Sequence, residues 1–148
     1  MKSVLYLIVS VLLLACADQQ GAQPPSRLEE LRGHWVVINY WAQWCKPCIE
    51  EIPELNALDR TYDQVTVLGV NFDGATGQEL AQQQQQLGVA FATLEADPSE
   101  DLGIPRPVVL PTTLIVSPDG ELTQTLVGPQ TLESLALATR QTTGGNTE

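Results

Sequence analysis

The chain has 148 residues, a length that fits a single domain. Its 18 acidic residues outnumber its 7 basic residues, which gives a formal net charge of −11 at pH 7. Such acidity keeps a domain soluble and argues against a nucleic-acid-binding function.

The N-terminus resembles an export signal. Lys2 supplies a basic start, residues 4–14 are almost wholly apolar, and a small residue precedes Cys16. The apolar stretch falls far short of the roughly 20 residues that a membrane-spanning helix needs, so residues 1–15 are predicted to be a secretory signal peptide. The sequence Leu-Leu-Ala-Cys at 13–16 resembles a bacterial lipobox, in which the signal is cleaved before a cysteine that then carries lipid. A signal peptide cut elsewhere and an uncleaved anchor are the alternatives.

A lipid on Cys16 would tie the mature chain to a membrane of the cell envelope, with the domain facing the periplasm. Residues 16–26 then form a tether between lipid and domain. Ala17 rather than Asp follows the lipidated residue, which favours the outer membrane in a bacterium with two membranes. Export also places the other two cysteines, Cys45 and Cys48, in a compartment where disulfides persist.

Residues 27–140 are predicted to form the folded domain, followed by a flexible polar tail at 141–148. Strands are expected at 35–41, 65–72, 89–94, 112–116 and 121–127, the last two joined as a hairpin by Pro118-Asp119-Gly120. Helices are expected at 27–32, 45–60, 76–87 and 131–140, with a single helical turn at 99–102. This order predicts an α/β fold with a central mixed sheet and helices on both faces.

Three local features carry separate expectations. Pro53 lies inside the helix predicted at 45–60 and should kink that helix or end its first part. The glutamine run at 82–86 is expected to be a solvated helix face. His34 follows a turn glycine and is expected at the surface.

Cys45 and Cys48 are three residues apart, after the strand predicted at 35–41 and at the start of the next helix. A cysteine at a helix N-terminus lies at the positive end of the helix dipole, which stabilises the thiolate that attacks disulfides. The second cysteine, one turn later, is within reach to resolve a mixed disulfide. A structural disulfide and half of a zinc site are the alternatives, but one His and no second CxxC leave a zinc site without ligands. No metal or cofactor is therefore expected here.

Four separate segments carry a resemblance to a known family. They are the strand and cysteine motif at 37–48, Glu51-Ile52-Pro53, an insertion at 73–108, and the segment 110–116 that begins Leu110-Pro111. Together they resemble the TlpA/ResA-like thiol-disulfide oxidoreductases of the thioredoxin superfamily, over about residues 28–140. The resemblance implies a thioredoxin-like fold and a redox enzyme in which Cys45 attacks and Cys48 resolves.

The resemblance also implies roles for residues around the cysteines. Pro111 should be cis, in a turn beside the cysteines, and Leu110 should offer its backbone to a substrate strand. An ordinary trans proline at a strand start is the alternative. Trp44, next to Cys45, would present an apolar patch to partner proteins, and packing at the rim of the core is the alternative.

Asn39 stands where ordinary thioredoxins carry a buried Asp, and the TlpA-like branch has Asn at this position. The resemblance therefore gives the proton-handling role to Glu51, three residues after Cys48. A partly buried carboxylate has a raised pKa and can accept or return the proton of the resolving thiol. The alternative is a surface helix residue like Glu50 and Glu54.

The resemblance implies a reductant that acts on exported proteins with disulfides, such as apocytochromes, and takes electrons from a membrane thiol-disulfide donor. The Lys-Pro pair between the cysteines leaves the redox direction open, since CxxC proteins span roughly −270 to −120 mV. A peroxiredoxin-like peroxidase is one other function, but it needs Thr where Ala42 stands and a downstream arginine such as Arg106 or Arg140. A copper-binding thioredoxin-like module is another. Such modules carry a CxxxC motif and a distant His, whereas this chain has CxxC and its His lies upstream.

Overall fold

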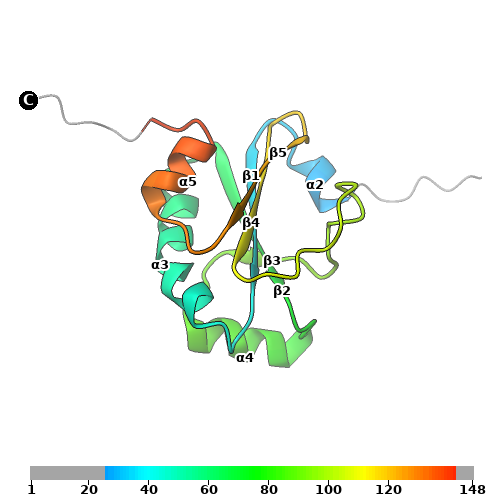
Figure 1. Ribbon diagram of the computed structural model, residues 1–148, viewed down its shortest axis with the longest axis vertical. Coiled ribbons are helices and arrows are strands. Elements are labelled where there is room, and N and C mark those ends of the chain that lie inside the picture. Colours follow the sequence, from blue (N-terminus) through cyan, green and yellow to red (C-terminus); the bar gives the residue numbers. More distant parts are fainter. Residues whose placement is uncertain (1–25, 143–148) are drawn as a thin grey trace, which may run out of the picture.

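The computed structural model describes residues 26–142 and is shown in Figure 1. The predicted signal peptide, the lipidation site Cys16, nearly all of the tether and most of the tail lie outside the described residues. A mixed five-stranded sheet with the order β3-β2-β1-β4-β5 forms the centre, with β1 parallel to β2 and antiparallel to β4. Its strands are β1 (Trp35–Trp41), β2 (Val65–Asn71), β3 (Ala92–Thr93), β4 (Thr112–Val116) and β5 (Leu122–Val127).

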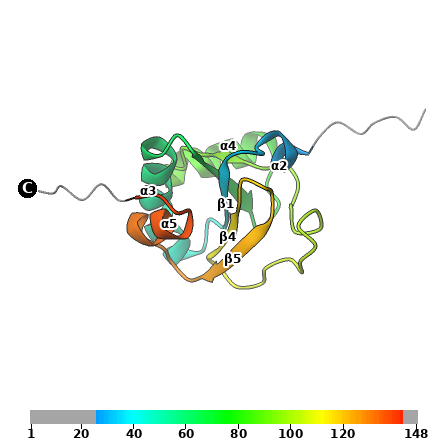
Figure 2. The ribbon, with the colours of Figure 1, turned by 90° about the horizontal axis from the view of Figure 1, so that it is seen from above.

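Helices cover the sheet as the α/β prediction requires. Within residues 26–142 they are α2 (Arg27–Glu30), α3 (Lys46–Thr61), α4 (Gly77–Leu87) and α5 (Leu132–Ala138). α3 and α5 pack against each other on one face, and α2 lies on the other (Figure 2). α4 lies across the end of the sheet at which β1 finishes (Figure 1).

The central strand β1 is buried on both faces, which explains why its sequence is apolar apart from Asn39. Val37 faces α3 and α5, where it packs in one cluster with Leu55 and Leu135. Ile38 faces the other way and packs in a second cluster, to which Leu28 of α2 contributes. Alternate residues of a strand point to opposite faces, so this one strand connects the two halves of the core.

α3 carries the cysteine motif at its start. Cys45 is the N-cap residue, and Pro47 lies in the first turn, where a missing N–H costs no helical hydrogen bond. The helix continues past Pro53 to Thr61, so the predicted ending of its first part does not occur. Pro53 itself is exposed, whereas buried side chains before and after it, such as Leu55, hold the helix against the core.

Several smaller expectations need correction. The strand predicted at 89–94 is reduced to β3, because the N–H of Val89 is donated to the Gln84 carbonyl and that of Ala90 to the Asn56 side chain. By contrast, the single helical turn predicted at 99–102 is present, since the Leu102 N–H donates to the Pro98 carbonyl at 3.0 Å, as in one turn of α-helix. Gln83 is buried and accepts a hydrogen bond from Asn71, so the glutamine run is not wholly solvated.

His34 is also less exposed than expected: it is half-buried, and its Nδ1 is buried with no hydrogen-bond partner among residues 26–142. Other local predictions are confirmed. β4 and β5 form the expected antiparallel hairpin, and α5 lies within the helix predicted at 131–140. Thr131 caps α5 by accepting a hydrogen bond from the Ser134 N–H. No helix within residues 26–142 is long and apolar enough to cross a membrane.

Candidate active site

Cys45 and Cys48 are joined by a disulfide at the N-terminus of α3, with 5.3 Å between their Cα atoms. The N–H of Cys48 donates a hydrogen bond to the Cys45 sulfur at 3.3 Å. Cys45 is the more exposed of the two, but only 4% of it is accessible, and Cys48 is fully buried. A partner must therefore bind closely over Cys45 to reach its sulfur.

The start of α3 favours a thiolate at Cys45. The first turn of the helix contains no acidic residue, so the positive end of the helix dipole is not neutralised within that turn. Lys46 adds a positive charge nearby, but its amine lies 3.8 Å from the Glu50 carboxylate, and both side chains are well exposed. Solvent screens such a charge, so the helix N-terminus is the more important contribution.

The bond between Leu110 and Pro111 is cis, as predicted. The turn is held by two hydrogen bonds: Thr112 Oγ1 donates to the Val109 carbonyl at 2.7 Å, and the Gly128 N–H donates to the Pro111 carbonyl at 2.9 Å. The Leu110 side chain packs against the cluster that contains both cysteines. Neither backbone polar group of Leu110 has a hydrogen-bond partner within residues 26–142, which leaves both available to a bound chain.

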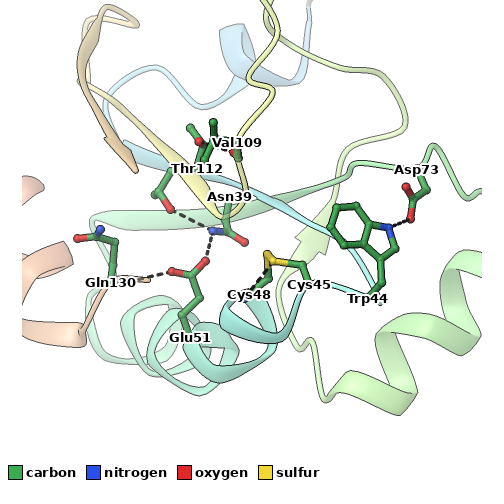
Figure 3. Close-up of a disulfide and its surroundings, with 10 residues drawn as sticks. Asn39, Trp44, Cys45, Cys48, Glu51, Asp73, Val109, Thr112 and Gln130 are labelled. Atoms are coloured by element: carbon green, nitrogen blue, oxygen red, sulfur yellow. Dashed lines mark hydrogen bonds between the residues drawn. A yellow bond between two sulfur atoms is a disulfide. The ribbon is translucent and has the colours of Figure 1, made fainter. Parts of the chain in front are cut away.

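Glu51 lies one turn beyond Cys48 and is almost wholly buried, with 1% of the residue exposed. Figure 3 shows its carboxylate beside Asn39 and the backbone of Gln130. Asn39 Nδ2 donates to Oε1 at 2.7 Å, and the Gln130 N–H donates to Oε2 at 2.9 Å. Burial raises the pKa of Glu51 to about 7, although both hydrogen bonds act to lower it. Glu51 thus differs from its neighbour Glu50, which is exposed.

Trp44 lies on the opposite side of the disulfide from Glu51 (Figure 3). The residue is 66% exposed, and its Nε1 donates to Asp73 Oδ2 at 2.8 Å. The Trp44 and Phe72 rings make an edge-to-face contact, with 6.3 Å between ring centroids. Trp41, by contrast, is fully buried in the cluster with the cysteines.

An apolar groove adjoins the cis-proline turn, and the sequence reasoning did not identify it. Its lining includes Pro105, Pro107, Val108, Val109 and Val127, and the three valines are exposed. The apolar and proline residues just before Leu110 are the sequence feature that could have indicated this groove. Exposed apolar groups beside a reactive site are typical of surfaces that bind proteins.

No sequence motif identified the residues that bond to Glu51 and Asn39 from other parts of the fold. Gln130 and Thr113 are 79 and 74 residues away from their hydrogen-bond partners, Glu51 and Asn39 respectively. Only the pairing of β1 with β4 and the packing of α5 on α3 bring them together. No group of three or more His, Cys, Asp or Glu side chains suited to a metal ion occurs within residues 26–142.

The five-stranded sheet and the paired cysteines at the start of α3 define a thioredoxin-like protein. The chain belongs to the AhpC/TSA family, whose family model matches residues 13–125. Within the thioredoxin superfamily it is ResA-like.

The thiol-disulfide oxidoreductase ResA of Geobacillus kaustophilus is 32% identical over 111 residues, which make up 74% of this chain and 63% of that protein. The ResA of Geobacillus thermodenitrificans is 30% identical over 121 residues, 80% of this chain and 68% of that protein. This chain therefore spans less than two thirds of the first of these relatives. The crystal structure of StoA from Bacillus subtilis shares the fold, with a TM-score of 0.60 at 23% identity over 73% of this chain and 84% of that one.

Proposed function

We propose that this protein is a thiol-disulfide oxidoreductase that exchanges the Cys45–Cys48 disulfide with disulfides of other proteins. The observation that carries the proposal is the position of that disulfide, at the N-terminus of α3 and against the cis Leu110-Pro111 turn. The helix end favours a thiolate, and the unpaired Leu110 backbone offers a place for an extended segment of a partner. The names of the ResA relatives agree with this activity.

In the reducing direction, the Cys45 thiolate attacks one sulfur of the substrate disulfide, and the other substrate sulfur leaves as a thiolate. Cys48 gives its proton to the Glu51 carboxylate and attacks the Cys45 sulfur. This breaks the mixed disulfide and releases the second substrate thiolate. Two electrons pass from the enzyme dithiol to the substrate, and the Cys45–Cys48 disulfide is formed. The two substrate thiolates take up protons from solvent and from Glu51.

A carboxyl with a pKa near 7 is suited to this exchange of protons at neutral pH. An ordinary glutamate would be ionised almost completely and would hold a proton too weakly to return it. A more strongly shifted one would remain protonated and could not act as a base. The burial of Glu51 one helical turn after Cys48 and its raised pKa support Glu51 as the group that accepts and returns the proton.

The proposed partners follow from the expected export. We propose that the enzyme reduces disulfides of exported proteins such as apocytochromes and is re-reduced by a membrane thiol-disulfide donor. We also propose that lipid on Cys16 holds it at a membrane facing the periplasm. The apolar groove next to the cis-proline turn supports a protein substrate rather than a small one.

The arrangement gives no support to the peroxidase alternative. Ala42 is buried and has no hydroxyl group. Arg106 is bonded to Asp97, and Arg140 lies over the ring of Trp35. The partners of Arg106 therefore occupy its guanidinium group, and Arg140 lies at the start of β1, whereas the cysteines follow the end of that strand.

The test is the reduction of insulin disulfides by the full-length protein in detergent, with dithiothreitol as the source of electrons. We expect the wild type to accelerate the reaction and Cys45→Ser to abolish the acceleration. Cys16→Ser is the matched control, since it removes a cysteine outside the domain and should leave the rate unchanged. If the wild type reacted no faster than Cys45→Ser, the proposed function would be wrong.

A further inference from the structure

Arg106 connects two segments that border the redox site. Its Nη2 donates to the Phe72 carbonyl at 2.7 Å, and its guanidinium carbon lies 4.4 Å from the centroid of the Phe72 ring. The same side chain belongs to the segment that leads into the cis turn, since Leu110 follows four residues later. Arg106 thus fastens the end of β2 to the segment that carries the cis-proline turn.

Asp97 fixes the direction of the Arg106 side chain. The Arg106 Nε donates to Asp97 Oδ2 at 2.7 Å, while Tyr40, buried in β1, donates its hydroxyl to Oδ1 at 2.8 Å. Burial alone would raise the pKa of Asp97, but hydrogen bonds from Ser99, Tyr40 and Arg106 lower it below the usual value. Asp97 is therefore an ionised and anchored partner for the guanidinium group.

The contacts of Arg106 lead directly to Trp44, the residue before Cys45. Phe72, on which Arg106 stacks, makes the edge-to-face contact with the Trp44 ring. Asp73, the next residue, accepts the hydrogen bond from the Trp44 indole. These two interactions with the exposed indole therefore come from Phe72, which Arg106 contacts, and from Asp73, whose backbone nitrogen is joined to the Phe72 carbonyl that Arg106 binds.

We propose that Arg106 is a positioning residue that sets the orientation of the Trp44 indole beside Cys45, and thereby the affinity for protein substrates. The substrate step rests on the proposed function, whereas the orientation of Trp44 is measurable without any substrate. Arginine suits this task because its planar group stacks on an aromatic ring while donating hydrogen bonds in two directions. Lysine would keep the charge opposite Asp97 but could not make all three contacts.

The first measurement follows the indole N–H resonances of Trp35, Trp41 and Trp44 in the oxidised, ¹⁵N-labelled protein. Arg106→Ala should shift the Trp44 resonance and speed solvent exchange of its indole proton about tenfold, because local opening becomes easier. Arg140→Ala is the matched control, because Arg140 also lies over an aromatic ring, that of Trp35, with 5.6 Å between guanidinium carbon and ring centroid. It should shift the resonance of Trp35 and leave that of Trp44 in place.

The second measurement compares substrates. For insulin, Arg106→Ala should raise KM about fivefold and change kcat less than about twofold, as expected for a loss of binding alone. For oxidised glutathione, which is too small to cover the Trp44 surface, both constants should stay within about twofold of wild type. The reduction potential of the Cys45–Cys48 pair should not change, since Arg106 bonds to neither cysteine. Arg106→Lys should behave like Arg106→Ala toward insulin, and it replaces that variant if Arg106→Ala does not fold.

Two results would overturn the proposal. One is a Trp44 resonance that stays in place in a folded Arg106 variant. The other is a shifted Trp44 resonance with an unchanged KM for insulin. A wild type inactive toward insulin would instead contradict the proposed function, and the resonance of Trp44 would still test whether Arg106 orients the indole.

Discussion

The buried carboxylate of Glu51 accepts a hydrogen bond from the side-chain amide of Asn39, with 2.7 Å between Oε1 and Nδ2. The same amide donates to Thr113 Oγ1 at 3.0 Å, so a neutral side chain in β1 ties a carboxylate of α3 to β4. An aspartate at position 39 would place a second carboxylate beside the first and push one of the two pKa values strongly upward. Asparagine instead leaves Glu51 to titrate by itself, which suits a single proton acceptor next to Cys48.

Glu51→Gln tests this role through the rate of disulfide exchange. Glu51 must be ionised to accept the proton of Cys48, so the wild-type rate of insulin reduction should fall as the pH drops below about 7. Glu51→Gln should be slower at neutral pH by about tenfold or more and should lose that pH dependence. Glu54→Gln is the matched control, because Glu54 is one turn further along α3 and bonds to the Leu132 N–H. Superimposable profiles of wild type and Glu51→Gln would mean that another group handles the proton.

The raised pKa of Glu51 also predicts how stability depends on pH. In the unfolded chain this carboxyl ionises near pH 4.5, whereas in the folded protein burial holds its proton until about pH 7. The folded state therefore binds more protons in this window, and the free energy of unfolding should decrease as the pH rises from about 4.5 to about 7. The shift corresponds to about 3 kcal/mol as an upper bound. Urea unfolding at several pH values checks this, and Glu51→Gln should show a flatter dependence over the same range.

The sequence predicts the framework better than the site. The bounds of β1 and β4 agree with the predicted strands, because each is rich in β-branched or aromatic residues and is bounded by turn residues. The position of Glu51 could also be predicted from the sequence, since its place relative to Cys48 follows from helical geometry. The contact of Gln130 with Glu51 could not be predicted, because the two residues are 79 positions apart and meet only in the folded structure. The same holds for Arg106, whose contacts with Phe72 and Asp97 join three loop residues that no periodic pattern connects.

A substitution at Gly69, in β2, tests the close packing of this strand against Trp41. A Cβ at this position would lie 2.7 Å from Trp41 Nε1 and 2.9 Å from Thr93 Oγ1, closer than such atoms approach. Gly69→Ala should therefore destabilise the protein by about 1–3 kcal/mol through overpacking. Trp41 packs in the cluster with Cys45 and Cys48, so insulin reduction should slow as well. Urea denaturation gives the first quantity, and a variant as stable as wild type would contradict the expected overpacking.

Cys16→Ser tests the predicted lipid anchor. The sequence before Cys16 resembles a lipobox, so the native protein should start at a lipidated Cys16 and partition into the detergent phase of a membrane extract. Cys16→Ser should lose the lipid and escape cleavage at this site. Intact mass spectrometry of both proteins measures lipid and cleavage together. An unmodified Cys16 in protein isolated from its native host would rule out the anchor.

Cys48→Ala tests the order in which the two cysteines react. The exposed edge of the disulfide belongs to Cys45, which is 4% accessible, whereas Cys48 is fully buried beneath it. Without Cys48, the Cys45 thiolate can still attack a substrate disulfide, but the mixed disulfide cannot be resolved within the enzyme. Cys48→Ala should therefore accumulate covalent complexes with insulin chains that dithiothreitol releases, visible by non-reducing electrophoresis. Cys45→Ala is the matched control and should form none, because the remaining thiol is buried and is not the N-cap of α3. Complexes that form with Cys45→Ala but not with Cys48→Ala would reverse the assignment of attacking and resolving cysteine.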